Sequence, residues 1–172
     1  FPFADGSRWD PVKSRALIRR MTFDLNSKDD GFQEEVLFPD RAVVDLGRVD
    51  ERFMGHETRY AYTSFNDATN PLDRDRIGTG VRRLSNSYGI FDMKDRTMRS
   101  FFAGPTHALQ EVTFVPRHET AEEGDGWLMG TASNYAEMRT ELVVADTRHP
   151  EDGAVGRVIL PGGFTAMPSG SG

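Results

Sequence analysis

The sequence of 172 residues contains no cysteine, so disulfides, thiolate metal sites and cysteine nucleophiles are excluded within it. Basic residues are in deficit, with 21 Lys and Arg against 27 Asp and Glu. The resulting net charge of -6 argues against a nucleic-acid-binding surface. Long apolar runs are also lacking, and none approaches the roughly 20 residues that a membrane-spanning helix needs.

The N-terminal stretch "FPFADGSRWD" has neither the basic nor the apolar region of a signal peptide. We therefore expect a cytoplasmic protein without a transmembrane segment. The length suits one domain, covering residues 1–172. Yet 37% hydrophobic and 28% charged residues make the chain polar for a compact domain. This balance suggests that a partner segment completes its core.

Short apolar or alternating runs, separated by Asp, Gly, Asn and Pro, predict an all-β chain with little helix. The stretch from Asn66 to Gly80 has no apolar period and is predicted to be a long surface loop. We expect strands at residues 16–25, 33–38, 60–65, 88–93, 98–102, 112–115, 127–131, 141–145 and 155–160.

A weak internal repeat relates three segments, "RRMTFDLNSKDDGFQEEVLF", "YGIFDMKDRTMRSFF" and "TELVVADTRHPEDGAVGRVIL". In each, an apolar strand ends in an aspartate, a polar turn follows, and a second strand begins. Asp24, Asp92 and Asp146 hold the strand-end position, where a carboxylate accepts backbone N–H groups and starts a turn. Each copy therefore predicts an antiparallel hairpin, and their recurrence indicates blades of a β-propeller or, alternatively, an ordinary β-sandwich.

The four histidines, His56, His107, His118 and His149, do not stand at the spacing of a metal-ligating pair. We expect them to be exposed or loop histidines. His107 lies four residues before Glu111, a spacing that puts both side chains on one face of an extended strand but too far apart to touch. The residues alone show no complete active site.

Several segments in order resemble the carotenoid cleavage oxygenase family, and most closely its lignostilbene dioxygenase-like branch. They are "FPFADGSRWDP", "LIRRMTFDL", "GRVDERFMG" followed by "RYAY", "FFAGPTHALQEVTFVPR", and "EEGDGWLMG" followed by "ELVVADTRHPEDGAVGRVILP". The resemblance implies a seven-bladed β-propeller, of which this chain looks like roughly the last three blades. It also implies one iron(II), held by four histidines, and the cleavage of a carbon–carbon double bond by O2.

Two acids match family carboxylates that hydrogen-bond to the iron-bound histidines. Glu111, in "QEVTFVPR", stands at the head of the apolar run Val112 to Val115, where the strand is expected to enter the interior and an unpaired carboxylate would be costly. The alternative is an acid at the edge of the strand that faces solvent. The family often has proline at Val112. Asp45, in "VVDLGRVDERF", replaces a family glutamate and is one methylene shorter, so a water bridge or a backbone shift would be needed. Arg48, Asp50, Glu51 and Arg52 are predicted to form surface or inter-blade ion pairs.

The resemblance places the iron-ligating histidines outside this chain, so the chain alone should neither bind iron nor catalyse the reaction. Under the resemblance, Phe101, Phe102 and Leu109 are candidates for lining the substrate tunnel, and the favoured interpretation is that they form core between blades. The expected partners are a hydrophobic or aromatic alkene, O2 and the remaining blades. Two other hypotheses are a non-enzymatic propeller or sandwich that binds other proteins, and a hydrolase that uses some of the four histidines with a divalent metal.

Overall fold

The computed structural model describes residues 15–28, 31–43, 47–78 and 85–161. The chain divides into two compact units, Phe1–Val43 and Val44–Gly172. Within the described residues the structure consists of antiparallel sheets with very short helices, so the predicted all-β class is confirmed. In this part of the chain no helix has the length and apolar character needed to cross a membrane.

The described residues of the first unit form one hairpin, made of β1 (Arg19–Thr22) and β2 (Gln33–Val36). Both strands are exposed almost throughout, and an ion pair between Arg19 and Glu34 links them. The rings of Phe23 and Phe32 meet beyond the paired residues, with centroids 5.3 Å apart. Both side chains are at least half exposed.

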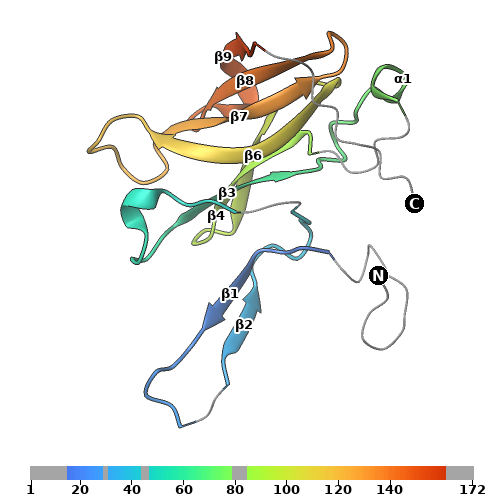
Figure 1. The fold of residues 1–172 in the computed structure, drawn as a ribbon. Coiled ribbons are helices and arrows are strands. Elements are labelled where there is room, and N and C mark those ends of the chain that lie inside the picture. Colours follow the sequence, from blue (N-terminus) through green and yellow to red (C-terminus); the bar gives the residue numbers. More distant parts are fainter. Residues whose placement is uncertain (1–14, 29–30, 44–46, 79–84, 162–172) are drawn as a thin grey trace, which may run out of the picture. The chain divides into compact units, whose positions relative to one another are not determined.

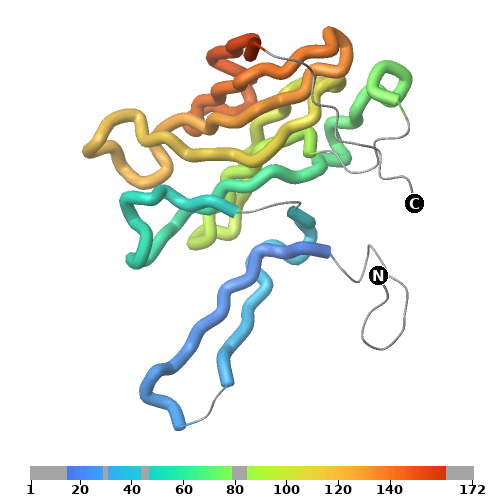
Figure 2. The backbone as a smooth tube through the Cα atoms, viewed as in Figure 1, coloured from blue at the N-terminus to red at the C-terminus, as the bar shows by residue number. Residues whose placement is uncertain are grey.

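The second unit contains two sheets in which consecutive strands are neighbours (Figures 1 and 2). One sheet is formed by β3 (Tyr60–Phe65), β4 (Ser87–Asp92) and β5 (Thr97–Phe102). The other is formed by β6 (His107–Pro116), β7 (Gly126–Asn134), β8 (Arg139–Asp146) and β9 (Ala154–Ile159). All nine strands overlap the ranges expected from the sequence, although β6 begins five residues before the predicted start at Val112.

The hydrophobic core of this unit lies between the two sheets. Tyr62 of β3 stacks on Phe114 of β6, with ring centroids 4.7 Å apart and planes within 4° of parallel. Tyr88 of β4 packs against Phe101 of β5 at 6.0 Å, and both rings are fully buried. Because burying a large apolar side chain contributes about 1.5–3 kcal/mol, this aromatic layer holds the sheets together and fixes one face of β6.

The three strand-end aspartates start their turns as predicted. Asp24 accepts the Asn26 N–H, Asp92 accepts two backbone N–H groups at Lys94 and Asp95, and Asp146 accepts that of Arg148. Each carboxylate leads from the first strand of a hairpin into the second, between β1 and β2, β4 and β5, and β8 and β9. The sequence repeat therefore corresponds to three hairpin turns that an aspartate side chain starts in the same way.

The predicted surface loop from residue 66 to 80 contains a short helix, α1 (Arg74–Ile77). The Asp73 side chain caps it by accepting the Arg76 N–H, and buried Ile77 anchors it against Ala108. A single apolar residue in a charged stretch carries no periodic signal, which explains why the helix was not expected. Two 3-10 turns, η1 (Glu51–Phe53) and η2 (Pro150–Asp152), complete the described elements.

The connection between β6 and β7 is fixed by arginines. Arg117 lies over the Trp127 ring at 4.1 Å and pairs with Asp125 at 2.8 Å and with Asp146 at 2.6 Å. Arg52, itself held by Asp50, donates to the Glu119 and Ala121 carbonyls of this connection. These contacts hold the C-terminal end of β6.

Candidate functional site

Glu111 lies at an irregularity in the middle of β6. Leu109 pairs with Ala132 and Val112 pairs with Gly130, so Gln110 and Glu111 together face the single residue between those partners on β7. This is a β-bulge, which leaves the extra residue unpaired and bends the strand. Because of the bulge, Leu109 and Val112 both point into the core, and Glu111 lies on the opposite face of the sheet.

Within this chain Glu111 is not buried, and its exposure matches the alternative of an acid at the strand edge that faces solvent. Its side chain is 50% exposed. Regular alternation from His107 would also have placed Glu111 on the same face as His107, but the bulge reverses the alternation between them. The strand avoids the cost of a buried carboxylate by this local shift in register.

Arg48 is the side chain that contacts the Glu111 carboxylate among the described residues, with Nη2 3.4 Å from Oε2. The Arg48 backbone is fixed by two hydrogen bonds of 2.7 Å with Tyr62 of β3. An ion pair this exposed contributes only about 0–1 kcal/mol, so the contact orients the carboxylate more than it stabilises the fold. The ion pairs expected in this segment are confirmed for Arg48 and for Arg52 with Asp50.

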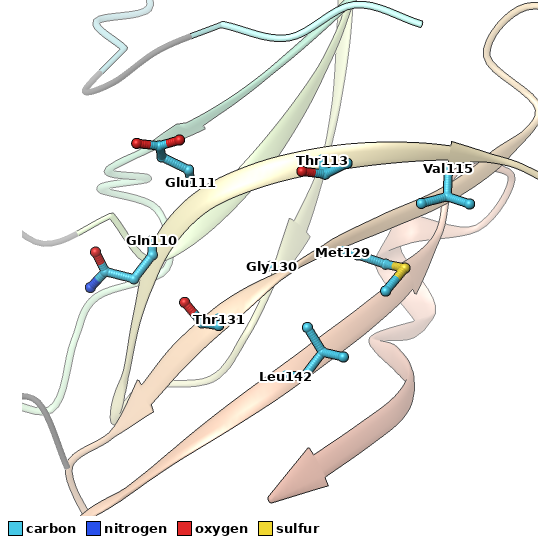
Figure 3. Close-up of a pocket in the computed structure, with 8 residues that line it drawn as sticks. All are labelled: Gln110, Glu111, Thr113, Val115, Met129, Gly130, Thr131 and Leu142. Atoms are coloured by element: carbon cyan, nitrogen blue, oxygen red, sulfur yellow. The ribbon is translucent and has the colours of Figure 1, made fainter. Parts of the chain in front are cut away.

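Glu111 borders a shallow pocket of about 570 Å³ on the outer face of β6, β7 and β8 (Figure 3). Its lining is polar near the bulge and apolar farther along the strands, where Val115, Met129 and Leu142 lie. The eight lining residues are Gln110, Glu111, Thr113, Val115, Met129, Gly130, Thr131 and Leu142. The sheet thus presents a half-buried apolar surface with one carboxylate at its edge.

A second carboxylate, which sequence reasoning missed, is completely buried at the near end of the same sheet. Glu141 of β8 is 1% exposed and accepts hydrogen bonds from Asn134 at 2.9 Å, Arg139 at 2.7 Å and Arg157 at 3.1 Å. Burial by itself raises the Glu141 pKa, but these donors outweigh it and lower the pKa to about 2. Glu141 is therefore ionised and saturated with donors, which suits a structural role and not proton transfer.

His107 contacts this cluster, and its predicted place among the exposed or loop histidines is wrong. Its side chain is 13% exposed, and Nε2 lies 3.5 Å from the Glu141 carboxylate. Burial, and then the charge of Arg157, lower the His107 pKa below its usual range. The pairing of His107 with Asn134 in the ladder brings it to Glu141, a contact that no sequence spacing indicates.

The other three histidines, His56, His118 and His149, are exposed as expected. Among the described residues no group of three or more His, Cys, Asp or Glu side chains could hold a metal ion. The hypothesis of a hydrolase with a metal site built from these histidines therefore has no support in the described part of the chain.

Of the remaining predicted site residues, the structure describes the three tunnel-lining candidates. Phe101 is fully buried and Leu109 is 5% exposed, and both belong to the core between the sheets. Phe102 is half-buried at the end of β5. This arrangement agrees with the interpretation that Phe101 and Leu109 pack between blades, and tunnel lining stays a prediction. Asp45 lies outside the described residues.

Comparison with known proteins identifies the family. The family model described as "Retinal pigment epithelial membrane protein" (RPE65) matches residues 3–170. The chain is 32% identical over 161 residues to lignostilbene-alpha,beta-dioxygenase isozyme III of Sphingomonas paucimobilis, with 94% of this chain and 32% of that protein covered. It is 33% identical over 161 residues to isoeugenol monooxygenase of Pseudomonas putida, with 94% and 33% covered.

The crystal structure of Pseudomonas brassicacearum lignostilbene dioxygenase is similar to this chain, with a TM-score of 0.81 and 31% identity over 94% of this chain and 33% of that one. The chain thus spans about a third of the length of the relatives it matches. These relatives are oxygenases, and the solved structures are carotenoid oxygenase-type propellers. The chain therefore belongs to the RPE65, or carotenoid cleavage oxygenase, family, and its sheets form part of a β-propeller.

Proposed function

We propose that the complete protein is an iron(II)-dependent dioxygenase that cleaves the carbon–carbon double bond of a stilbene, carotenoid or apocarotenoid with O2. The products would be two carbonyl compounds. Support comes from the names of the similar proteins, which include a lignostilbene dioxygenase and resveratrol cleavage oxygenases. An aromatic alkene is favoured because the relatives at 31–33% identity are named for resveratrol, lignostilbene and isoeugenol.

The observation that carries the proposal is the position of Glu111. Its carboxylate projects from a bulge at the edge of a half-buried face, and among the described residues only Arg48 contacts it. A histidine that binds a metal through one ring nitrogen needs an acceptor for the N–H of the other. Glu111 fits that task, because one of its oxygens is held by Arg48 and the carboxylate is otherwise open to a partner from outside this chain.

The described residues do not contain a metal-ligand set, so the histidines that hold iron would come from the remainder of the complete protein. When bound, iron(II) supplies the activation of O2 beside the double bond. The contribution of this chain is to fix the orientation and tautomer of one ligating imidazole through Glu111. Asp45 would do the same for a second imidazole.

We further infer that the outer face of β6, β7 and β8 packs against the part of the complete protein that lies outside this chain. Val115, Met129 and Leu142 form a half-buried apolar strip there. Propeller blades stack face to face, and an apolar sheet face gains about 25 cal/mol for each Å² removed from water. The remaining blades are therefore the partner that this face requires.

The test of the Glu111 proposal is Glu111→Gln in the complete protein, with Glu122→Gln as matched control. Glu122 is an exposed glutamate on the connection after β6. We expect Glu111→Gln to reduce both the bound iron and the formation of aldehyde from a stilbene by about 10- to 100-fold. Replacing a residue that hydrogen-bonds to a metal-ligating histidine typically has an effect of this size. Oxygen uptake with a stilbene and an apocarotenal, measured side by side, assigns the substrate class.

Equal iron content and turnover in the two variants would contradict the role of Glu111. A complete protein that binds no iron and consumes no O2 with either substrate would contradict the enzymatic proposal. That result would favour the non-enzymatic interaction module.

A further inference from the structure

The bulge that carries Glu111 lacks the regular backbone pairing that two neighbouring strands otherwise form. Opposite Gln110 and Glu111, β7 offers only Thr131, so the ladder cannot pair both residues. The position of the Glu111 carboxylate thus depends on contacts outside the ladder. Arg48 holds the carboxylate end of the side chain, and a different group holds the backbone.

That group is the phenol of Tyr88, which reaches the bulge from the other sheet. Tyr88 is fully buried in β4, and its hydroxyl donates a long hydrogen bond of 3.4 Å to the Glu111 carbonyl oxygen. Most buried phenols have such a partner. Burial also raises the Tyr88 pKa far above its usual range, so the hydroxyl remains a donor at any working pH.

Gly130 makes room for this contact. It pairs with Val112, directly beside the bulge. A Cβ atom at Gly130 would lie 2.1 Å from the Tyr88 hydroxyl oxygen and 2.5 Å from the Glu111 carbonyl oxygen. Glycine inside a strand weakens the strand. At position 130 it allows the Tyr88 hydroxyl and the Glu111 carbonyl to approach the β7 backbone closely, which a residue with a Cβ atom would prevent.

We propose that Tyr88, with the space that Gly130 leaves for it, is a positioning residue for the Glu111 carboxylate. The inference rests on the proposed role of Glu111 in orienting an iron-bound histidine. Tyr88 acts through the backbone of the bulge and touches neither metal nor substrate. Loss of its hydroxyl lets the bulge relax, so the carboxylate no longer meets the imidazole N–H at the right place.

The test uses the complete, iron-loaded protein with Tyr88→Phe, Glu111→Gln and the double variant. The first readout is the rate of iron loss to a chelator, and the second is the change in kcat and in KM. We expect Tyr88→Phe to speed iron loss and lower kcat by about 3- to 10-fold, the size of one neutral hydrogen bond, with KM little changed. In the Glu111→Gln background the same substitution should have no further effect.

Tyr60→Phe is the matched control, because Tyr60 pairs with Asp92, four positions along the ladder from Ser64, the partner of Tyr88. It should lose iron at the wild-type rate. Gly130→Ala should speed iron loss more than Tyr88→Phe does, because it adds a clash to the lost contact. Adding Tyr88→Phe removes the closest clash, so the rate should fall toward that of Tyr88→Phe alone.

The outcomes separate the two proposals. Wild-type iron retention and kcat in Glu111→Gln would overturn the role of Glu111, and the inference with it. A defective Glu111→Gln together with a normal Tyr88→Phe would overturn only the positioning role. An effect of Tyr88→Phe that persists in full in the Glu111→Gln background would also overturn it, because Tyr88 would then act by another route.

Discussion

Replacement of Glu141 by glutamine should strongly destabilise the complete protein. The carboxylate is 1% exposed and stands between Arg139 and Arg157, whose side chains are 34% and 35% exposed. Glutamine keeps the size of the side chain but removes its charge. It also turns an –NH₂ group toward one of two arginines that can only donate. That guanidinium group loses an acceptor, and the other keeps a neutral amide oxygen in place of a carboxylate.

The magnitude follows from the pKa of Glu141. On folding this pKa falls from 4.5 to about 2. At about 1.4 kcal/mol for each pKa unit, the ionised form contributes ~3 kcal/mol of stability near neutral pH. The loss on breaking a buried pair is of similar size, about 3–5 kcal/mol, and partial exposure of the arginines reduces it. We expect Glu141→Gln to lower the free energy of unfolding by about 2–4 kcal/mol at pH 7.

The assay is denaturant unfolding of the wild type, Glu141→Gln and the control Glu137→Gln as a function of pH. Glu137 also pairs with Arg139 but is 53% exposed, so its replacement should cost less than about 1 kcal/mol. A lowered carboxylate pKa stabilises the folded state above 4.5, and this contribution disappears as the pH falls toward 2. The difference between wild type and Glu141→Gln should therefore shrink over that range.

A loss of less than about 1 kcal/mol at pH 7 would show that the arginines are satisfied by solvent and that the cluster is not a buried ion network. A difference that stays constant from pH 7 to pH 2 would show that packing, and not the charge of Glu141, accounts for the effect.

Two further predictions concern the core and the outer face of the second unit. Tyr62→Phe should raise the free energy of unfolding by about 1 kcal/mol in denaturant melts, because the buried Tyr62 hydroxyl finds no partner among the described residues; a loss of stability would reveal a partner. If the remaining blades cover this face, as proposed, Met129→Asp buries an unpaired charge and should lower the stability of the complete protein by about 3 kcal/mol or more. Thr97→Asp, on an exposed strand position, should change the stability little. Equal melting temperatures of the last two variants would contradict blade packing on this face.

The strands and their turns were predictable because their causes are local. The pattern of apolar residues marked all nine strands, and the aspartates at positions 24, 92 and 146 marked the hairpin turns through hydrogen bonds to residues two or three positions away. The family, too, could be identified from ordered short motifs. Helix α1 was not predicted, because it is stabilised by one capping side chain and one buried isoleucine. Two such residues do not produce the repeating apolar pattern by which a helix is predicted.

The sequence by itself determined the all-β class, the hairpins and the family, because strand alternation and turn chemistry act between near neighbours. Only the tertiary structure decided where the carboxylates lie. A one-residue bulge moved Glu111 from the expected interior to a half-exposed face, and strand pairing buried Glu141 beside His107 and two arginines. Both outcomes depend on the register between strands, and register is set by the packing of whole sheet faces and not by the residues on either side of each acid.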